Sequence, residues 1–361
     1  MGHPSGSKIQ GDILMEAGFT NILSFRDIEI GFKSGKSRHV LLPPLNGSAV
    51  KGELIAVIGK NGIGKSTLLR TFAGLQDLIG GNLTIDGENI VDFSRLQLSG
   101  KIGYISTEIV KVSNMKVYDL VSLGRFPHTN WLGRINSSDH QMILEAISRT
   151  GMADFRTRLI SELSDGERQR AMIAMVLAQD AAVMIMDEPT AFLDISSKYE
   201  IIHLLNELTR NRNKTVIFST HDLATAVSQA DKIWLLKERG ITEGAPEDLM
   251  LDGSFETLFD SNKVDFNSSD GSFTVRNTKK GRIYVKGDGN KRYWTEKALI
   301  RAGYGISESE SEAVVEVPSS TDSTWKCRLD GLNGEFVSVY ELVIWLRNKN
   351  ITSENTSCNY Q

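Results

Sequence analysis

Nine consecutive residues carry the glycines and polar side chains that bind phosphate groups. They are, in order, Gly59, Lys60, Asn61, Gly62, Ile63, Gly64, Lys65, Ser66 and Thr67, and the first eight match the pattern G-x-x-x-x-G-K-S. Glycines let the backbone curl so that successive N–H groups face one anion, and a helix that starts there adds its positive end. In this pattern the Lys65 ammonium reaches the outer phosphates and the Ser66 hydroxyl binds Mg²⁺. The stretch predicts a site for a nucleoside triphosphate, and its flanks disfavour an incidental glycine-rich turn.

Two adjacent acids, Asp187 and Glu188, follow an apolar run at 182–186. A run of this length is typical of a strand buried on both faces, and α/β sheets keep their ligand chemistry at the carboxyl ends of such strands. Asp187 could there hold Mg²⁺, directly or through water, and Glu188 could polarise an attacking water. Two solvated acids at a strand end are the alternative, which the phosphate-binding pattern upstream disfavours.

A second helix start resembles an anion site. Ser164 and Glu167 form the Ser-x-x-Glu pattern of a capping box, ahead of a strong helix-forming run at 168–179. The free N–H groups at such a helix start can hold an anion. A plain helix cap is the alternative, and from this segment alone it is favoured.

Two single residues have functional and structural interpretations. His221 follows an apolar run at 215–220, so it lies at the carboxyl end of a predicted core strand, where it could bond a γ-phosphate or the attacking water. A helix cap or a surface histidine is the alternative. Phe32 stands before the polar segment 33–37, where it could stack on adenine; an ordinary core or strand-end aromatic is equally compatible.

The elements that must position these residues are apolar strands alternating with helices. We expect strands at 22–32, 54–58, 83–87, 101–106, 182–186 and 215–220, with a hairpin at 233–244. We expect helices at 68–73, 117–123, 168–179 and 246–259, and one opened by a capping box at Ser138 and Gln141. The strand–loop–helix setting of Gly59 to Thr67 is the one that a phosphate-binding loop requires, and the order predicts an α/β fold.

In this order the segments resemble the nucleotide-binding subunit of an ABC transporter. The resemblance covers about residues 20–260 and rests on the phosphate loop together with residues 163–167, which correspond to that family's signature motif. It implies a P-loop NTPase core with an antiparallel β part and a helical subdomain at about 108–165. It also implies an ATPase that binds ATP and Mg²⁺ and pairs head to tail with a second copy, so that each ATP lies between one phosphate loop and the partner's signature helix.

The resemblance implies a role for each matching residue. These roles are adenine stacking for Phe32, phosphate binding for Gly59 to Thr67, ATP binding from the partner copy for Ser164, Asp165, Gly166 and Glu167, metal binding for Asp187, general base for Glu188, joining of the two sites for Asp194, and the switch histidine for His221.

Two departures from the family pattern stand out. The signature is usually L-S-G-G-Q, whereas here Asp165 replaces the first Gly and Glu167 replaces the Gln. Asp165 would add negative charge near a phosphate, so we expect its side chain to point away. The family also has a Gln after the strand ending near Ser106, where it touches Mg²⁺ and water and couples the site to the membrane subunit. Thr107 and Glu108 stand there instead, and either could ligate Mg²⁺ through oxygen.

A narrower likeness is to cassettes that import ferric siderophores, haem or cobalamin. It rests on Leu-Val-Ser-Leu-Gly-Arg-Phe-Pro-His at 120–128 and on Arg-Gln-Arg-Ala-Met-Ile-Ala-Met at 168–175. It implies separate transmembrane permease subunits as partners and, indirectly, a periplasmic or lipoprotein substrate-binding protein. It also implies a peripheral position on the cytoplasmic face of the inner membrane.

Composition narrows the class of protein. The 361 residues are 40% hydrophobic and 24% charged, which is typical of a soluble globular protein. The net charge is −4 and the sequence has no basic stripe, so we expect no nucleic-acid partner. The two cysteines, Cys327 and Cys358, favour a reducing compartment over a disulfide framework. The first twelve residues lack a signal-peptide core, and no apolar run approaches the roughly 20 residues that span a bilayer, so we expect a cytosolic chain.

The composition changes after Asn262. Short strands at 273–276, 282–286, 313–317 and 325–329, with helices near 295–302 and after Ser338, predict a small α+β domain. We therefore expect a lead-in at 1–20, an ATPase domain at 21–260, an accessory domain at 261–349 and a tail at 350–361. Regulatory, ligand-binding, dimer-stabilising and purely structural roles remain open for the accessory domain. For the whole chain, the alternative to an importer ATPase is a soluble ABC-type ATPase with a remodelling or regulatory role.

Overall fold

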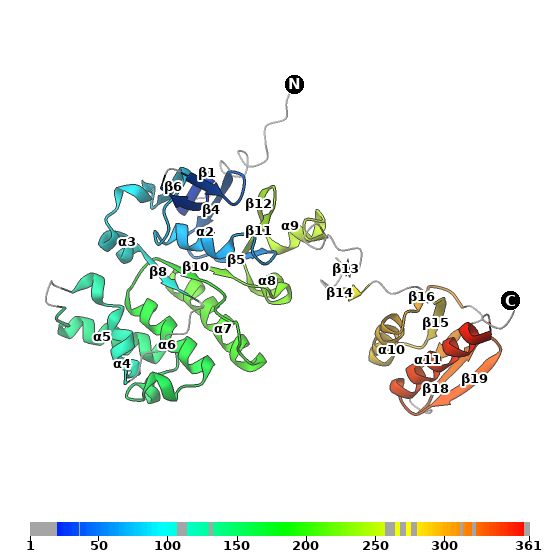
Figure 1. Cartoon of the computed structure of the whole chain (residues 1–361). Helices are drawn as coiled ribbons and strands as arrows, with labels where there is room; N and C mark the ends of the chain where they lie inside the picture. Colours follow the sequence, from blue (N-terminus) through cyan, green and yellow to red (C-terminus); the bar gives the residue numbers. More distant parts are fainter. Residues whose placement is uncertain are drawn as a thin grey trace, which may run out of the picture. The chain divides into compact units, whose positions relative to one another are not determined.

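The structure of the chain is a computed structural model (Figure 1). It describes residues 20–35, 37–106, 114–129, 133–256, 264–267, 272–275, 280–310, 313–319 and 323–356. The chain divides into two compact units, Met1–Leu258 and Phe259–Gln361, and each is described by itself. Within the described ranges, every helix is too short or too polar to cross a bilayer.

A six-stranded sheet forms the centre of the first unit. Its order is β12 (Gly240–Gly244), β11 (Lys232–Lys237), β5 (Leu54–Gly59), β10 (Thr215–Ser219), β9 (Val183–Met186) and β8 (Ile102–Ile105). Only the edge strand β12 runs antiparallel to its neighbour, and every residue of β5, β9 and β10 is buried. Four helices belong to this layer, α2 (Lys65–Phe72), α7 (Ile195–Arg212), α8 (Leu223–Gln229) and α9 (Pro246–Leu251). The apolar runs therefore form a parallel sheet covered on both faces, as predicted.

A second, antiparallel sheet shares the core of the first. It orders β4 (Leu45–Val50), β1 (Asn21–Glu29), β6 (Gly80–Ile85) and β7 (Glu88–Asn89), and a separate hairpin pairs β2 (Gly31–Ser34) with β3 (Ser37–Val40). The rings of Phe25, Phe72 and Trp234 pack with centroids 5.1–5.7 Å apart, which joins this sheet to α2 and β11. Figure 1 shows β1, β4 and β6 at one end of the unit, away from α4, α5 and α6.

Three helices build a separate apolar cluster. They are α4 (Val117–Leu123), α5 (Ser137–Arg149) and α6 (Asp165–Ala178), and the cluster reaches Ala178, beyond the subdomain range of about 108–165. The helix α3 (Arg95–Lys101) and the short 3₁₀ turns η1 (Ile90–Asp92), η2 (Phe126–His128), η3 (Ala153–Phe155) and η4 (Ile160–Glu162) connect these parts. The predicted cap of α5 at Ser138 and Gln141 is wrong: Asn136 and Asp139 form the capping box, since the extended Asn136 accepts the Asp139 N–H.

Two elements of the first unit end at local backbone signals. Helix α9 stops at Leu251 rather than continuing to residue 259, because Gly253 takes a left-handed φ of 73° and the Ser254 N–H turns back to the Leu249 carbonyl. The predicted Asp-Gly turn after β6 is present, with φ of 50° at Asp86 and 81° at Gly87.

The second unit holds a five-stranded sheet and two helices around its own core. A hairpin of β13 (Val264–Asn267) and β14 (Ser272–Val275) precedes the sheet, whose order is β16 (Gly305–Ser307), β15 (Arg282–Lys286), β17 (Val314–Glu316), β18 (Trp325–Leu329) and β19 (Leu332–Phe336). Residues of α10 (Gly289–Arg301) and α11 (Val339–Thr356) complete the core. The sequence did not predict β13, β16 or β19. Helix α11 runs to Thr356, past the predicted tail boundary at 350, because no Gly or Pro occurs there to end it.

One buried ion pair holds the helical cluster together. The Arg125 Nε donates to Asp139 Oδ1 at 2.9 Å, and its Nη1 donates to the Ala178 carbonyl at 2.8 Å, so that one guanidinium links the ends of α4, α5 and α6. Both side chains are almost fully buried. The bonds that the Asp139 carboxylate accepts from the Asn136 N–H and from Arg125 together outweigh its desolvation and lower its pKa.

We expect Arg125→Ala to reduce the free energy of unfolding by about 3–5 kcal/mol, because it leaves a buried carboxylate without its cation. Arg149→Ala is the matched control, since Arg149 pairs with Glu145 on the exposed face of α5 and should cost about 0.5 kcal/mol or less. Urea unfolding of both variants followed by circular dichroism measures the difference. Equal losses in the two variants would contradict this role of the buried pair.

Candidate functional site

The phosphate loop links β5 to α2 through glycines that its shape requires. Gly62 and Gly64 take φ of 77° and 112°, values that other residues rarely adopt. A side chain at Gly59 would place its Cβ 2.8 Å from the Leu236 carbonyl oxygen on β11. Gly64 is the N-cap of α2 and offers no side-chain cap, so the first N–H groups of the helix face the loop. The loop has the shape of an anion cradle.

The Lys65 ammonium points back into this loop. Its Nζ donates to the carbonyls of Gly59 at 2.9 Å and Lys60 at 3.2 Å, and the residue is only 6% exposed. Burial lowers the pKa of Lys65, and the carboxylates of Glu188 and Asp187 oppose that shift. The lysine thus lies within electrostatic reach of both acids while its own bonds are to loop carbonyls that bound phosphates could replace.

The two acids lie at the end of β9 beside β10. The Ser219 hydroxyl donates to Asp187 Oδ1 at 2.6 Å and accepts the Glu188 N–H at 2.9 Å. The Asp187 N–H donates to the carbonyl of Ile105 on β8 at 2.9 Å. The Glu188 carboxylate pairs with His221 Nε2. Four polar residues from two adjacent strands therefore meet at one edge of the sheet.

The loop of His221 is tied to α7. Asp222 is the N-cap of α8 and accepts from the backbone N–H of Thr225 at 3.1 Å and from its hydroxyl at 2.8 Å. Its Oδ2 also pairs with Lys198 in the first turn of α7. The bonds from Lys198 and Thr225 outweigh desolvation and lower the pKa of Asp222. These contacts fix the backbone on the carboxyl side of the histidine.

The predicted signature segment forms the start of α6 as a complete capping box. The Ser164 N–H donates to Glu167 Oε2 at 2.8 Å, and the Glu167 N–H donates to Ser164 Oγ at 3.3 Å. The bond from the Ser164 N–H lowers the pKa of Glu167. The exposed Asp165 carboxylate accepts from Arg168 at 2.7 Å on its own helix, so its charge is partly compensated in place.

The start of α6 lies against the start of α7. A Cβ on Gly166 would come within 2.7 Å of Ser197 Oγ, so only glycine permits this approach. Ser197 in turn donates to Asp194, the N-cap of α7, from its N–H to Oδ1 and from its hydroxyl to Oδ2, both at 2.9 Å. These two bonds lower the pKa of Asp194. The signature segment and the Asp194 loop are therefore one packed assembly.

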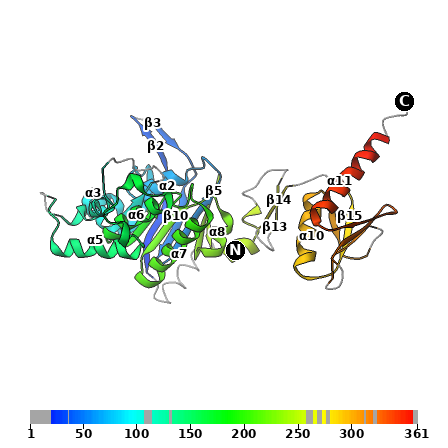
Figure 2. The ribbon, with the colours of Figure 1, turned by 90° about the horizontal axis from the view of Figure 1, so that it is seen from below.

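Phe32 projects on the β2–β3 hairpin, which Figure 2 shows extending from the unit. The residue is 53% exposed and does not belong to the core. The hairpin is tied to the segment after α2, where Lys33 donates to the Leu78 carbonyl at 2.9 Å and Gln76 bonds the Gly31 carbonyl. The aromatic ring is thus held near the C-terminal side of the phosphate-loop helix with a face open to solvent.

The structure gathers some predicted residues and separates others. Lys65, Asp187, Glu188 and His221 belong to one cluster, whereas Asp194 joins the signature segment. Among the described residues, no hydrogen bond links Gly59 to Thr67 with Ser164 to Glu167. Thr107 and Glu108 lie outside the described residues. Sequence reasoning missed Ser219; a hydroxyl at the end of an apolar strand was the available signal.

The donor set of the acid cluster fits Mg²⁺. Ser66 offers a hydroxyl and Asp187 a carboxylate whose Oδ1 is occupied by Ser219, leaving Oδ2 for a metal ligand. Groups of three or more His, Cys, Asp or Glu side chains arranged for a metal are absent from the part of the chain that the structure describes. Mg²⁺ suits such a sparse oxygen site, because substrate phosphates and water supply its remaining ligands.

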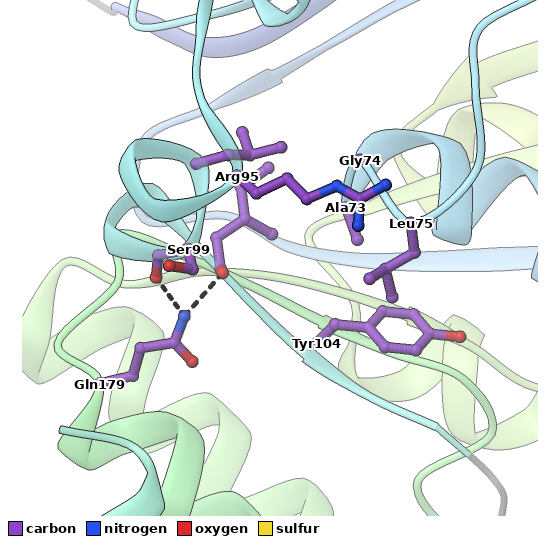
Figure 3. A pocket seen from close by; sticks show the side chains of 9 residues that line it. Ala73, Gly74, Leu75, Arg95, Ser99, Tyr104 and Gln179 are labelled. Atoms are coloured by element: carbon purple, nitrogen blue, oxygen red, sulfur yellow. Dashed lines mark hydrogen bonds between the residues drawn. The ribbon is translucent and has the colours of Figure 1, made fainter. Parts of the chain in front are cut away.

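A cavity of about 290 Å³ lies beside β8 (Figure 3). The end of α2 contributes Leu75, α3 contributes Leu98 and Ser99, and β8 contributes Tyr104. Gln179 closes it from the end of α6, where its Nε2 donates to the Ile102 carbonyl at 2.8 Å and also bonds the Ser99 carbonyl. The cavity therefore lies between the core and the helical cluster, next to the strand that leads to residues 107 and 108.

Comparisons with known proteins agree with this geometry. A profile described as ABC transporter matches residues 42–191, and one described as Iron ABC transporter C-terminal domain matches residues 280–347. An uncharacterized ABC transporter ATP-binding protein of Methanocaldococcus jannaschii is 33% identical, covering 75% of this chain and 95% of that protein. The achromobactin transport ATP-binding protein CbrD of Dickeya dadantii is 35% identical (66% and 87% covered), and the ferric enterobactin transport ATP-binding protein FepC of Escherichia coli is 34% identical (62% and 83%).

Solved structures resemble the first unit. A chain of a transporter described as of the metal-chelate type, in an inward-facing conformation, superposes with a TM-score of 0.58 at 27% identity, over 71% of this chain and 96% of its own. CbiO1 of Clostridium perfringens gives 0.57 at 28% identity, over 65% and 92%. The chain belongs to the family of ABC transporter ATP-binding proteins, which confirms the resemblance and the predicted fold class. Its activity is the hydrolysis of ATP coupled to transport.

Nucleotide affinity should fall as pH rises through the lowered pKa of Lys65. Phosphates bind the charged ammonium, so above that pKa each pH unit should weaken binding by about tenfold until the complex itself deprotonates. Calorimetric titration with ATP between pH 7 and 10, in buffers of different ionisation enthalpy, measures the affinity and the proton uptake. Lys65→Arg is the control, because a guanidinium stays charged throughout. Equal proton uptake in this variant would contradict the assignment to Lys65.

Proposed function

We propose that this chain powers the import of a metal chelate of the siderophore, haem or cobalamin type through a separate membrane permease. The observation that carries the cargo class is the match of residues 280–347 to the iron ABC transporter C-terminal domain. The names of two relatives, for achromobactin and ferric enterobactin transport, support the same class. Neither observation depends on the phosphate loop alone, which occurs in many NTPases and therefore does not indicate a cargo.

In the proposed mechanism the chain's residues position ATP and a water molecule. Lys65 and the N–H groups at the start of α2 hold the phosphates, and the exposed face of Phe32 stacks on adenine. Ser66 and Asp187 would hold Mg²⁺, which would supply further charge neutralisation when bound. Glu188 orients and deprotonates the attacking water, and His221, bonded to Glu188, reaches the γ-phosphate side. Catalysis is then mainly positioning and electrostatics.

We infer that a second copy completes each site. One chain carries two anion-binding helix starts, α2 and α6, and no described hydrogen bond brings them together. Head-to-tail pairing would place Ser164, Gly166 and Glu167 of a second copy against the phosphates held by Gly59 to Thr67. Because Asp194 is bonded to Ser197 and Ser197 contacts Gly166, a movement of the Asp194 loop would move the signature segment with it.

The proposed membrane partner is a polytopic permease, and the chain would sit on the cytoplasmic face of the membrane as a peripheral subunit. The cavity between Leu75, Leu98 and Tyr104 supports this proposal, since it opens beside β8 and its apolar lining includes Leu75, which is 62% exposed. A substrate-binding protein outside the membrane would contact the permease and not this chain. Chelate specificity would then reside in those partners.

Glu188→Gln should abolish ATP turnover, because the amide cannot accept the proton of water, while ATP binding stays intact and the dimer accumulates. Steady-state phosphate release, calorimetry and size-exclusion chromatography with ATP measure these three properties. Glu145→Gln, on the exposed face of α5, is the matched control and should hydrolyse ATP normally. Near wild-type hydrolysis by Glu188→Gln would remove Glu188 from the role of general base.

The proposed transport function is tested with the native host complex. Affinity purification of the tagged chain from detergent-solubilised membranes should recover a polytopic permease. Deletion of the gene for this chain should reduce uptake of radiolabelled iron–siderophore, haem or cobalamin. Complementation with the wild-type chain should restore uptake, and complementation with Glu188→Gln should not. Copurifying RNA without a membrane protein, and normal uptake of all three chelates in the deletion strain, would favour a soluble remodelling ATPase.

A further inference from the structure

Ser219 occupies the centre of the parallel sheet at its carboxyl edge. It is the last residue of β10 and is fully buried. In register it pairs with Val57 on β5, two residues before the phosphate loop, and it lies one step beyond the Phe218–Met186 pair with β9. The residue therefore stands between the strand that delivers the phosphate loop and the strand that delivers the two acids.

Its hydroxyl uses both of its hydrogen-bonding functions on those acids. The O–H donates to Asp187 Oδ1 at 2.6 Å, and the oxygen accepts the Glu188 N–H at 2.9 Å. The short donor distance is typical of a bond to a charged oxygen, and such bonds are about twice as strong as neutral ones. A buried hydroxyl is costly unless it is bonded, and here two consecutive acids on the neighbouring strand satisfy it.

The bond to Glu188 acts on a strained peptide. Glu188 has a φ of 49°, in the left-handed region, which costs a non-glycine residue free energy unless the surroundings fix it. The N–H of this same residue is the one that Ser219 accepts, while the Asp187 N–H is held by Ile105 on the opposite side. The turn that aims the Glu188 carboxylate at His221 is therefore anchored from both neighbouring strands.

We propose that Ser219 is a positioning residue for ATP hydrolysis, which rests on the roles proposed above for Asp187 and Glu188. By occupying Asp187 Oδ1, it directs the other carboxylate oxygen toward the metal side. By accepting the Glu188 N–H, it sets the direction of the general base. One hydroxyl thereby couples the orientation of the metal-binding acid to that of the water-activating acid.

Ser219→Ala tests this proposal in the full chain. It should lower kcat by about tenfold to a hundredfold, the range expected when a reacting group is displaced by up to about 1 Å. The KM for ATP in the presence of Mg²⁺ should rise no more than several-fold, less than kcat falls, because the phosphate loop is untouched and only the metal contact is weakened. The Mg²⁺ dependence of ATP affinity, measured by calorimetry with and without the metal, should weaken several-fold, whereas metal-free ATP affinity should stay the same.

Two further variants separate positioning from stability. Ser219→Thr keeps the hydroxyl and should retain kcat within about threefold of wild type. Thr215→Val removes an equally buried hydroxyl at the other end of β10, where it accepts from the Gly52 N–H at 3.0 Å, and should lower the melting temperature but not kcat. If Ser219→Ala does not fold, Ser219→Cys, a weak donor of similar size, should show the same loss of kcat.

The results distinguish this proposal from the proposed catalytic roles. Wild-type kcat and Mg²⁺ dependence in Ser219→Ala, or an equal loss of kcat in Thr215→Val, would overturn the role of Ser219 and leave that of Glu188 intact. Normal turnover in Glu188→Gln would instead overturn the general base. Failure of Ser219→Thr to restore kcat would show that the shape of the site, and not the hydroxyl, is what matters.

Discussion

Parallel backbone pairing of β10 with β5 on one side and with β9 on the other is the interaction on which the site depends. This pairing aligns the ends of three fully buried strands, so that the phosphate loop, the two acids and His221 leave the sheet at the same edge. The three strands alone do not order these groups. The orientation of these groups is set by hydrogen bonds between neighbouring strands, from Ser219 to Asp187 and from Asp187 to Ile105.

A second constraint is steric and concerns the start of α6. Gly166 permits this helix to approach α7 so closely that a Cβ here would meet Ser197, which is itself bonded to Asp194, the residue that caps α7. The ion pair of Arg170 with Glu200 adds a further link between these two helices. The signature segment is consequently attached to α7, which in turn holds Asp222 beside His221 through Lys198. In the proposed pairing, the groups that would face a neighbouring copy and the groups beside the chain's own phosphate loop are thus both attached to α7.

Local patterns predicted the elements well wherever one chemical rule dominates. The phosphate loop, the Ser164 cap and the Asp86–Gly87 turn each depend on a few adjacent residues, so the types of those residues are enough to predict the local structure. The cap of α5 was misassigned because two overlapping patterns, from Asn136 and from Ser138, compete within three residues. Short strands such as β16 and β19 carry too few alternating residues to be recognised.

The site could be predicted less completely than the fold. Asp187 and Glu188 stand out because they follow an apolar run, but the contribution of Ser219 depends on β10 lying next to β9 in register. That neighbour relation joins residues 32 positions apart and is set by sheet order, which adjacent residues do not encode. The membership of α6 in the helical cluster was missed for the same reason, since its buried face becomes apparent only against α4 and α5.

The two separate hydrophobic cores have an evolutionary consequence. Among the described residues, the buried apolar side chains of the first unit run from Ile22 to Phe255, and the core cluster of the second unit runs from Ile283 to Leu346. A domain with a hydrophobic core of its own can accept substitutions in that core without a compensating change in the other domain. A gene for such a chain can acquire, diversify or lose its C-terminal domain while the nucleotide-binding module stays under its own selection.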